Sequence, residues 1–270
     1  MKYFEGCTAM ITGASSGLGA EFARQLAPYA RGLVLVARRN DRLEELAQEL
    51  RGIHRELNVR IYCADLGHEG KRAELADWLQ KEAIPVDFLI NNAGLGDHGR
   101  FDCSDWKRVK SMLDVNISAL THLTHLLVPQ MLRGGRAAVL NVSSVASFFP
   151  LPHMAVYSAT KAYVTSFSEA LAIELRPKGI TVTALCPGPV ATEFFEVATR
   201  EGGQDAASHF ETFPAFVVSP QEAVAAGLHA VAKERARVIP GPLLAAAVGA
   251  ALILPFFIIR RILVWKADSI

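Results

Sequence analysis

A tyrosine and a lysine four residues apart, Tyr157 and Lys161, have a spacing that could support proton transfer. On a helix this spacing puts both side chains on one face, about one turn apart. A free tyrosine has a pKa of about 10 and is a poor acid–base group at neutral pH. A nearby ammonium group favours its phenolate form. The pair could therefore transfer a proton, although a surface pair with this spacing is common by chance.

A serine and an asparagine could complete such a site. Ser144 ends the expected strand 136–144 and lies thirteen residues before Tyr157. Ligands bind at the carboxyl ends of strands in open parallel sheets, and a hydroxyl there can donate to a carbonyl oxygen beside Tyr157. The neighbouring Ser143 is expected to point into the structure. Asn116 lies within an expected helix, where a buried Asn needs hydrogen-bond partners, so local bracing is its alternative role.

A glycine-rich turn near the amino terminus reads T-G-A-S-S-G-L-G from Thr12 to Gly19, between an apolar strand and the start of a helix. Glycines at such a turn allow unusual backbone angles and a close approach to a pyrophosphate, which then faces the free N–H groups of the helix. The turn therefore predicts a dinucleotide site, and a tight turn that binds nothing is the alternative. The expected contacts are Gly13, Ser15, Ser16, Gly17, Leu18 and Gly19.

Two arginines, Arg38 and Arg39, follow the second expected strand. A site for NAD(H) usually has an acidic residue here to hold the ribose hydroxyls. A guanidinium group instead suits a 2′-phosphate, because its fork of donors matches the phosphate oxygens. The sequence therefore predicts NADP(H) rather than NAD(H), unless both arginines only begin a solvated helix.

Two further strand ends are candidates for cofactor contact. Asp65 and Leu66 end the third expected strand, within reach of an adenine ring, although Asp65 could instead cap a helix. Asn92, Ala93 and Gly94 end the fourth strand, where small residues let the backbone pack against a ligand. The asparagine side chain could instead only brace the turn.

The elements that must position these residues alternate along the chain. Short apolar runs alternate with amphipathic stretches, a pattern that predicts a doubly wound, Rossmann-like α/β domain with a parallel sheet and helices on both faces. The expected strands are residues 7–13, 32–38, 58–66, 86–94, 136–144, 179–188 and 237–241. The expected helices are residues 17–27, 41–51, 70–82, 104–133, 157–175 and 221–234.

Length and composition are consistent with one such domain. The chain has 270 residues, of which 51% are apolar, enough to bury a substantial core. We assign 1–240 to a dinucleotide-binding and catalytic domain and 241–270 to its hydrophobic tail. A net charge of +1 gives no reason to expect nucleic acid as a partner. Four scattered cysteines and the lack of a signal peptide favour a reduced, cytoplasmic setting.

Together these motifs resemble those of the short-chain dehydrogenase/reductase family, in its shorter, non-extended branch. The resemblance covers residues 7 to about 240 and places every motif in the family's order. It rests on T-G-A-S-S-G-L-G at 12–19, N-N-A-G at 91–94, Asn116, Ser144, Y-S-A-T-K at 157–161 and P-G-P-V-A-T at 187–192.

The resemblance implies an NADP(H)-dependent oxidoreductase that interconverts a carbonyl and a secondary alcohol. Tyr157 would be the acid–base group, and Lys161 would lower its pKa and bind the ribose. Ser144 would orient the substrate oxygen, and Asn116 would hold a water linked to Lys161. The resemblance also implies a homo-oligomer and cofactor contacts from Pro187, Gly188, Val190 and Thr192. It further implies that no metal is needed. His122 and His125, three residues apart on an expected helix, have no third ligand at a plausible place and are expected to be ordinary helix positions.

Aromatic residues suggest a lipophilic carbonyl or alcohol substrate. Residues 192–219 break the alternation of elements and are expected to form a substrate lid. His153 lies in a segment expected to border the substrate, although solvation in a loop is its alternative. The phenylalanines expected to flank the pocket, unless they only build the core, are Phe148, Phe149, Phe194, Phe195, Phe210, Phe213 and Phe216.

The carboxyl-terminal tail allows three interpretations. Val238 to Ile259 carries no charge, Pro255 would kink a helix, and Arg260 and Arg261 follow. The tail could cover the pocket or a subunit interface, lie on a membrane surface with its basic residues near headgroups, or span a bilayer. Two rival functions follow: an NADP(H)-sensing module without catalysis, and a membrane-surface protein whose tail is the main element.

Overall fold

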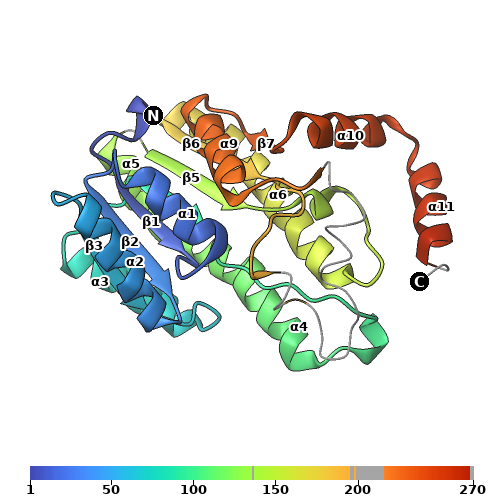
Figure 1. Cartoon of the computed structure of the whole chain (residues 1–270), viewed down its shortest axis with the longest axis horizontal. Coiled ribbons are helices and arrows are strands. Elements are labelled where there is room, and N and C mark those ends of the chain that lie inside the picture. Colours follow the sequence, from blue (N-terminus) through green and yellow to red (C-terminus); the bar gives the residue numbers. More distant parts are fainter. Residues whose placement is uncertain (136, 195–197, 199–215, 268–270) are drawn as a thin grey trace.

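A seven-stranded parallel sheet carries the core of the chain, with its strands in the order β3-β2-β1-β4-β5-β6-β7 (Figure 1). The computed structural model describes residues 1–135, 137–194, 198 and 216–267. The strands are β1 (Thr8–Thr12), β2 (Gly32–Ala37), β3 (Asn58–Cys63), β4 (Phe88–Asn91), β5 (Ala137–Val142), β6 (Ile180–Leu185) and β7 (Arg237–Val238). The crossover from β3 to β4 passes β1 and β2, so strand order reverses between β1 and β4.

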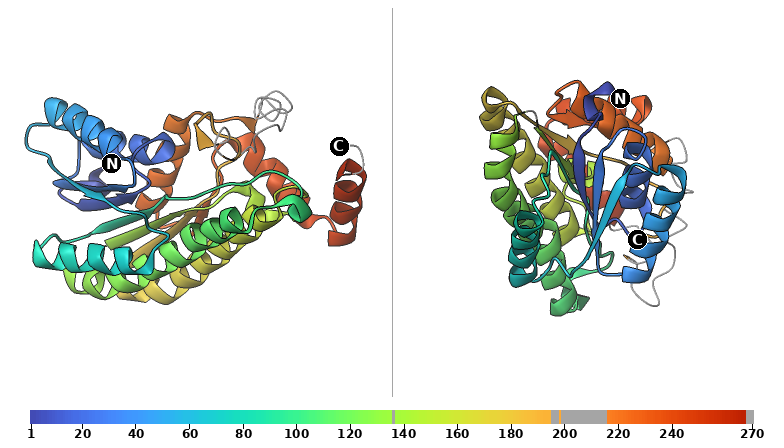
Figure 2. Two further views of the ribbon diagram at one scale, coloured as in Figure 1. Left: turned by 90° about the horizontal axis from the view of Figure 1, so that it is seen from below. Right: turned by 90° about the vertical axis from the view of Figure 1, so that its left-hand side faces the viewer.

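Helices cover both faces of the sheet, as the two views in Figure 2 show. The α-helices of the described residues are α1 (Gly17–Leu26), α2 (Asn40–Ile53), α3 (Glu69–Lys81), α4 (Trp106–Leu113), α5 (Leu120–Gly134), α6 (Ala155–Leu175), α9 (Pro220–Ala232), α10 (Pro242–Ile253) and α11 (Phe256–Ala267). In β1, Ile11 packs in the cluster that includes α1, α2 and α9, whereas Met10 packs in the cluster that includes α3, α5 and α6. Alternate side chains of one strand thus serve two layers, which makes the strand apolar throughout.

The doubly wound parallel sheet predicted from the sequence is confirmed. Each of the seven expected strands is present, but each begins or ends inside its expected range because apolar residues continue into the buried turns that follow. The boundary of α9 has a clear local cause. Ser219 accepts from the Glu222 backbone, while the Glu222 carboxylate accepts from the Ser219 backbone, a reciprocal cap that starts the helix.

The expected helix over 104–133 is divided into three parts. α4 ends at Leu113, a π-helical turn covers Asp114–Ala119, and α5 then begins at Leu120. A π-helical turn adds a residue to the helical repeat, which a hydrophobic period of 3.6 does not reveal. Asn116 lies in this turn.

The tail forms two helices rather than one. α10 ends at Ile253, and α11 begins at Phe256 beyond the break that Pro255 imposes. Leu244 and Val248 of α10 are buried against the body of the protein, whereas α11 lies beyond it (Figures 1 and 2). Within the described part of the chain, none of the helices combines the length and apolar character needed to cross a bilayer. Most of the expected lid, 195–197 and 199–215, lies outside the described residues.

Candidate active site

A cavity of about 630 Å³ lies at the carboxyl ends of β1 to β6. Most of the site residues predicted from the sequence line it: Gly13, Ser15, Ser16, Gly17, Leu18, Arg38, Arg39, Asp65, Leu66, Asn92, Ala93, Gly94, Ser144, Tyr157, Lys161, Pro187, Gly188, Val190 and Thr192. Gly19 and Asn116 do not line it, but both contact residues that do.

The glycine turn forms one wall of the cavity by close backbone packing. Gly13 has a φ of +67°, and a Cβ there would lie 2.9 Å from both Ala93 Cα and Asn92 Nδ2. A Cβ on Gly19 would overlap the Gly13 carbonyl, so Gly19 packs the helix onto the turn rather than touching a ligand. Gly17 also has a positive φ, of +54°, and begins α1. The turn therefore directs the first N–H groups of α1 toward the cavity, the arrangement that suits a pyrophosphate.

Arg39 reaches back from the end of β2 to the glycine turn. Its guanidinium group donates to Ser15 Oγ at 3.2 Å and to Ser16 Oγ at 2.7 Å. It also contacts the Glu193 carboxylate at 3.3 Å, and Arg42 contacts the same carboxylate at 2.6 Å. We call this group of residues the arginine corner: the guanidinium groups of Arg39 and Arg42 and the hydroxyls of Ser15 and Ser16. Such a set of donors suits a phosphate. The acidic side chain of Glu193, which the sequence analysis did not predict here, lies among them.

The strand-end residues Asp65 and Asn92 have structural duties as well as cavity positions. Asp65 Oδ1 accepts from the Gly67 backbone at 2.9 Å, which fixes the turn after β3. Asn92 Nδ2 donates to the Thr12 carbonyl at 2.9 Å and to the Gly13 carbonyl at 3.2 Å. Asn92 therefore ties β4 to the glycine turn, which is the bracing alternative of the sequence analysis.

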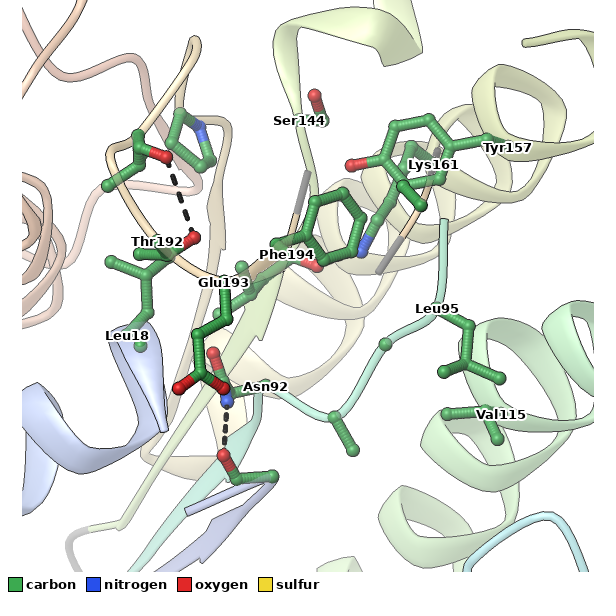
Figure 3. Close-up of a pocket in the computed structure, with 18 of the residues that line it drawn as sticks. Leu18, Asn92, Leu95, Val115, Ser144, Tyr157, Lys161, Thr192, Glu193 and Phe194 are labelled. Carbon is green, nitrogen blue, oxygen red and sulfur yellow. Dashed lines mark hydrogen bonds between the residues drawn. The ribbon is translucent and has the colours of Figure 1, made fainter. Parts of the chain in front are cut away.

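Tyr157 and Ser144 face the same space from different elements (Figure 3). Tyr157 lies in the first turn of α6, and Ser144 follows β5 and accepts from the Ala146 backbone at 3.1 Å. Burial raises the pKa of Tyr157 to about 12, and a hydrogen bond with Ser144 acts in the opposite direction. Ser143 points the other way, as expected, and donates to the Lys161 carbonyl at 2.9 Å.

Lys161 is a buried ammonium group without a carboxylate partner among the described residues. Its Nζ donates to the Val142 carbonyl at 2.8 Å and lies 5.7 Å from the centre of the Tyr157 ring. Burial lowers its pKa to about 8. The expected lowering of the Tyr157 pKa by Lys161 is not found, because the ammonium group is turned toward β5 rather than toward the phenol oxygen.

Asn116 braces the chain behind the cavity. Its Oδ1 accepts from the Leu95 backbone at 2.8 Å, while Nδ2 donates to the Leu95 carbonyl at 2.9 Å and to Thr160 Oγ1 at 3.0 Å. All these partners are protein groups, so the side chain fixes the loop after β4 to α6. The structure thus favours the bracing role that the sequence analysis left open.

The end of the cavity beyond Tyr157 is mainly apolar. Leu95, Leu151, Met154 and Phe194 line it, and the Phe194 ring lies 5.6 Å from the Tyr157 ring. His153 and His98 line the cavity too, with ring centres 5.9 Å apart, which is compatible with the expectation that the segment of His153 borders the substrate.

Among the described residues, the other phenylalanines that were expected to flank the pocket do not line the cavity. Phe148 and Phe149 do not line the cavity, since the Phe148 ring packs under the Arg237 guanidinium group at 5.1 Å. Phe216 is also absent from the lining. Phe195, Phe210 and Phe213 lie outside the described residues. The prediction that Phe148 and Phe149 flank the pocket was therefore wrong.

Sequence reasoning missed several lining residues, among them Val115, His98 and Glu193, whose positions depend on tertiary structure. Val115 comes from the π-helical turn, His98 from a loop, and Glu193 from the residue after the last recognised motif. The position of Glu193 beside Thr192 is a signal that could have brought it under consideration. No sequence pattern links it to Arg42, 151 residues away.

The residues present fit a nicotinamide dinucleotide. The glycine turn, Arg39 of the arginine corner, Gly94 and Gly188 all line one cavity, and Tyr157 and Ser144 line the same cavity. A Cβ on Gly94 would lie 3.5 Å from Lys161 Nζ, so the lysine reaches the place where backbone and ligand would meet. Among the described residues, no group of His, Cys, Asp and Glu could hold a metal ion.

Comparison with known proteins agrees with this geometry. A family model described as short chain dehydrogenase matches residues 7–202. The chain is 38% identical over 206 residues to sulfoacetaldehyde reductase 2 of Chromohalobacter salexigens, covering 74% of this chain and 78% of that protein. It resembles a short-chain dehydrogenase from Sphingobium yanoikuyae in complex with NADPH, with 34% identity, a TM-score of 0.77 and coverage of 91% and 92% of the two chains. The bulky-bulky ketone specific alcohol dehydrogenase from Comamonas testosteroni has 30% identity, a TM-score of 0.72 and coverage of 92% and 95%.

Proposed function

This chain belongs to the short-chain dehydrogenase family and is an oxidoreductase, and from that premise we propose that it reduces a carbonyl group to a secondary alcohol with NADPH. The observation that carries the proposal is the position of Tyr157 and Ser144 in the same cavity as the glycine turn. Such a cavity holds a proton donor and a hydrogen-bond donor beside a cradle for the dinucleotide.

In the proposed reaction, Tyr157 supplies the proton. NADPH, when bound, supplies a hydride to the carbonyl carbon. The C=O π bond breaks, and its electron pair takes the phenol proton, so that the carbonyl oxygen becomes a hydroxyl. Ser144 donates to that oxygen and stabilises the charge that develops on it. Burial raises the pKa of Tyr157 to about 12, so the phenol holds its proton at neutral pH, while the hydrogen bond with Ser144 lowers that pKa and thus favours proton donation.

Lys161 has a supporting role in this proposal. Its ammonium group lies beside Gly94, where it can hold the ribose hydroxyls with its remaining donors.

The preference for NADP(H) rests on the arginine corner. Arg38 and Arg39 line the end of the cavity that is bounded by the glycine turn, and Arg39 already donates to Ser15 and Ser16. The same donors suit a 2′-phosphate. The Sphingobium yanoikuyae relative in complex with NADPH supports this choice.

We propose a lipophilic ketone as the substrate class. The wall formed by Leu95, Leu151, Met154 and Phe194 offers an apolar surface next to Tyr157, and such a surface favours apolar groups on both sides of the carbonyl. The Comamonas testosteroni relative, which is specific for bulky ketones, supports this choice.

Substitutions at two tyrosines of α6, one inside the cavity and one outside it, test the proposed reaction. We expect Tyr157→Phe to lower turnover of a ketone by about 100-fold or more, since general acids contribute at least that much, while NADPH binding persists. The readout is loss of NADPH absorbance across a panel of ketones, run beside NADH. Tyr163→Phe is the matched control, because Tyr163 lies on the same helix outside the cavity. Equal turnover in Tyr157→Phe and wild type would refute the role, and NADPH binding without turnover of any ketone would favour the sensing module.

We also propose that the tail rests on an anionic membrane surface. Leu243, Ile253 and Phe257 are 65%, 85% and 71% exposed, an apolar surface that a monomer in water rarely presents. Arg260 and Arg261 follow on exposed positions of α11, and residues 238–267 contain only basic charges. Apolar side chains beside basic ones are typical of helices that lie in the headgroup region. A second copy of the chain is the competing occupant.

A further inference from the structure

Glu193 occupies the arginine corner in the way that a bound phosphate would. Its two carboxylate oxygens separately engage Arg39 and Arg42, at 3.3 and 2.6 Å. The hydrogen bond from Arg42, followed by that from Arg39, keeps the pKa of Glu193 below its usual value, so the side chain is an anion at neutral pH. Glu193 lines the same cavity as Arg39, Ser15 and Ser16.

A 2′-phosphate and Glu193 would need the same donors. Arg39 is the residue that joins the glycine turn to the end of β2. An incoming phosphate dianion that pairs with Arg39 would therefore meet a second anion on the same guanidinium group, and like charges at this distance repel. A nucleotide without the 2′-phosphate meets no such competitor.

The ion pairs of Glu193 are weak enough to be displaced. The side chains of Arg39, Arg42 and Glu193 are 43%, 41% and 42% exposed, and solvent screens pairs of this kind strongly. Glu193 keeps Arg42 as a partner when it leaves Arg39, so the carboxylate has an alternative position. Displacement therefore weakens the binding of the phosphorylated cofactor without preventing it.

We infer that Glu193 is a cofactor-selectivity residue, an internal anion that competes with the 2′-phosphate for Arg39 and reduces the preference for NADPH over NADH. The inference rests on the proposed dinucleotide site. It differs from a simple clasp over the cofactor, which would help or hinder both nucleotides equally.

Calorimetric titration with NADPH and NADH tests this inference. We expect Glu193→Gln to lower the Kd for NADPH by roughly three- to fivefold, the size of an exposed ion-pair effect, and to leave the Kd for NADH unchanged. Adenosine 2′,5′-bisphosphate and 5′-AMP are the second pair of probes and should show the same contrast without the nicotinamide end. In an Arg39→Gln background, Glu193→Gln should no longer affect NADPH binding.

Glu49→Gln is the matched control. Glu49 pairs with Arg24 at 2.7 Å, with comparable exposure, away from the cavity, so its neutralisation changes the net charge equally. An equal change for both nucleotides, weaker NADPH binding in Glu193→Gln, or the same effect in Glu49→Gln would each overturn the inference. Wild-type protein that binds neither NADPH nor NADH would refute the proposed function and this inference with it.

Discussion

At the scale of single residues, the buried ammonium group of Lys161 is the most costly feature of the site. Its side chain is almost fully buried, and a backbone carbonyl is the partner that the structure gives it. A charge in such a place costs free energy unless it is paired. We interpret the burial of this charge, which lowers the stability of the fold, as a requirement of cofactor binding.

Replacing this lysine should therefore stabilise the protein while it impairs function. In the folded chain the pKa of Lys161 is about 8, below the ordinary value of 10.5. Between these two values the unfolded chain binds more protons, so the contribution of Lys161 to stability rises with pH. Below pH 8 both states are protonated, and the full cost is present. We expect Lys161→Met to raise the free energy of unfolding at pH 7 by about 1–3 kcal/mol, an advantage that shrinks between pH 8 and 10.5.

Urea denaturation from pH 7 to 10 measures this effect as a difference between variants. The difference matters because of two thiols, the half-buried Cys7 and the buried Cys186. Burial raises their pKa values to about 12 and about 11, so they make stability fall with rising pH in both proteins. Lys81→Met, an exposed position, should show no comparable trend. An advantage of Lys161→Met that is constant with pH, or none at pH 7, would contradict the assignment.

Residue types at strand ends were predictable from the sequence, whereas contacts across the chain were not. Tyr157, Lys161, Ser144 and the glycine turn were found because helix spacing and strand ends fix their places. Glu193 and the partners of Asn116 were missed because their contacts join segments with no periodic relation. The direction of Phe148 was also missed, since the chain after β5 turns it toward Arg237.

At the scale of elements, α10 connects the tail to the cavity. A Cβ on Gly188 would lie 2.5 Å from Leu244 Cδ2, and Leu244 is only 7% exposed. The helix thus supports the backbone of the loop after β6 from behind. The apolar character of α10 was evident from the sequence, but which of its leucines faces the body was not, because nearly every position of the helix is apolar.

Two adjacent leucines of α10 differ in burial, since Leu244 is buried and Leu243 is exposed. We expect Leu244→Ala to lower the free energy of unfolding by about 2–3 kcal/mol, as buried leucines do, and to weaken NADPH binding through the Gly188 loop. Leu243→Ala, at an exposed position, should change stability by less than about 0.5 kcal/mol. Urea denaturation and nucleotide titration give both readouts. Equal destabilisation by the two substitutions would show that α10 does not pack as described.

At the scale of the whole molecule, the proposed membrane contact of the tail predicts binding to anionic lipid. We expect the full chain to sediment with vesicles of phosphatidylcholine and phosphatidylglycerol, and weakly with phosphatidylcholine alone. Replacing both Arg260 and Arg261 by Gln should lower binding by roughly tenfold or more, since each basic residue near an anionic surface contributes about 1 kcal/mol.

A charge-matched variant, Arg55→Gln with Arg60→Gln, is the control, because both arginines are exposed far from the tail in sequence. It should bind like the wild type. Sedimentation equilibrium in the absence of lipid distinguishes the competing occupant. A dimer that dissociates on Leu243→Ala or Phe257→Ala, in a chain that ignores vesicles, would assign the tail surface to a second copy.

The strand order has a consequence for how the protein comes into being. β1 lies in the middle of the sheet, between β2 and β4, so a nascent chain that has emerged only as far as β3 can already pair three strands and form the glycine turn. The opposite wall arrives later, with β4 and β5, and the proton donor arrives with α6. Synthesis thus supplies the glycine turn and the arginines first. β4, whose Asn92 braces that turn, joins them later through contacts between distant segments, and such contacts form slowly.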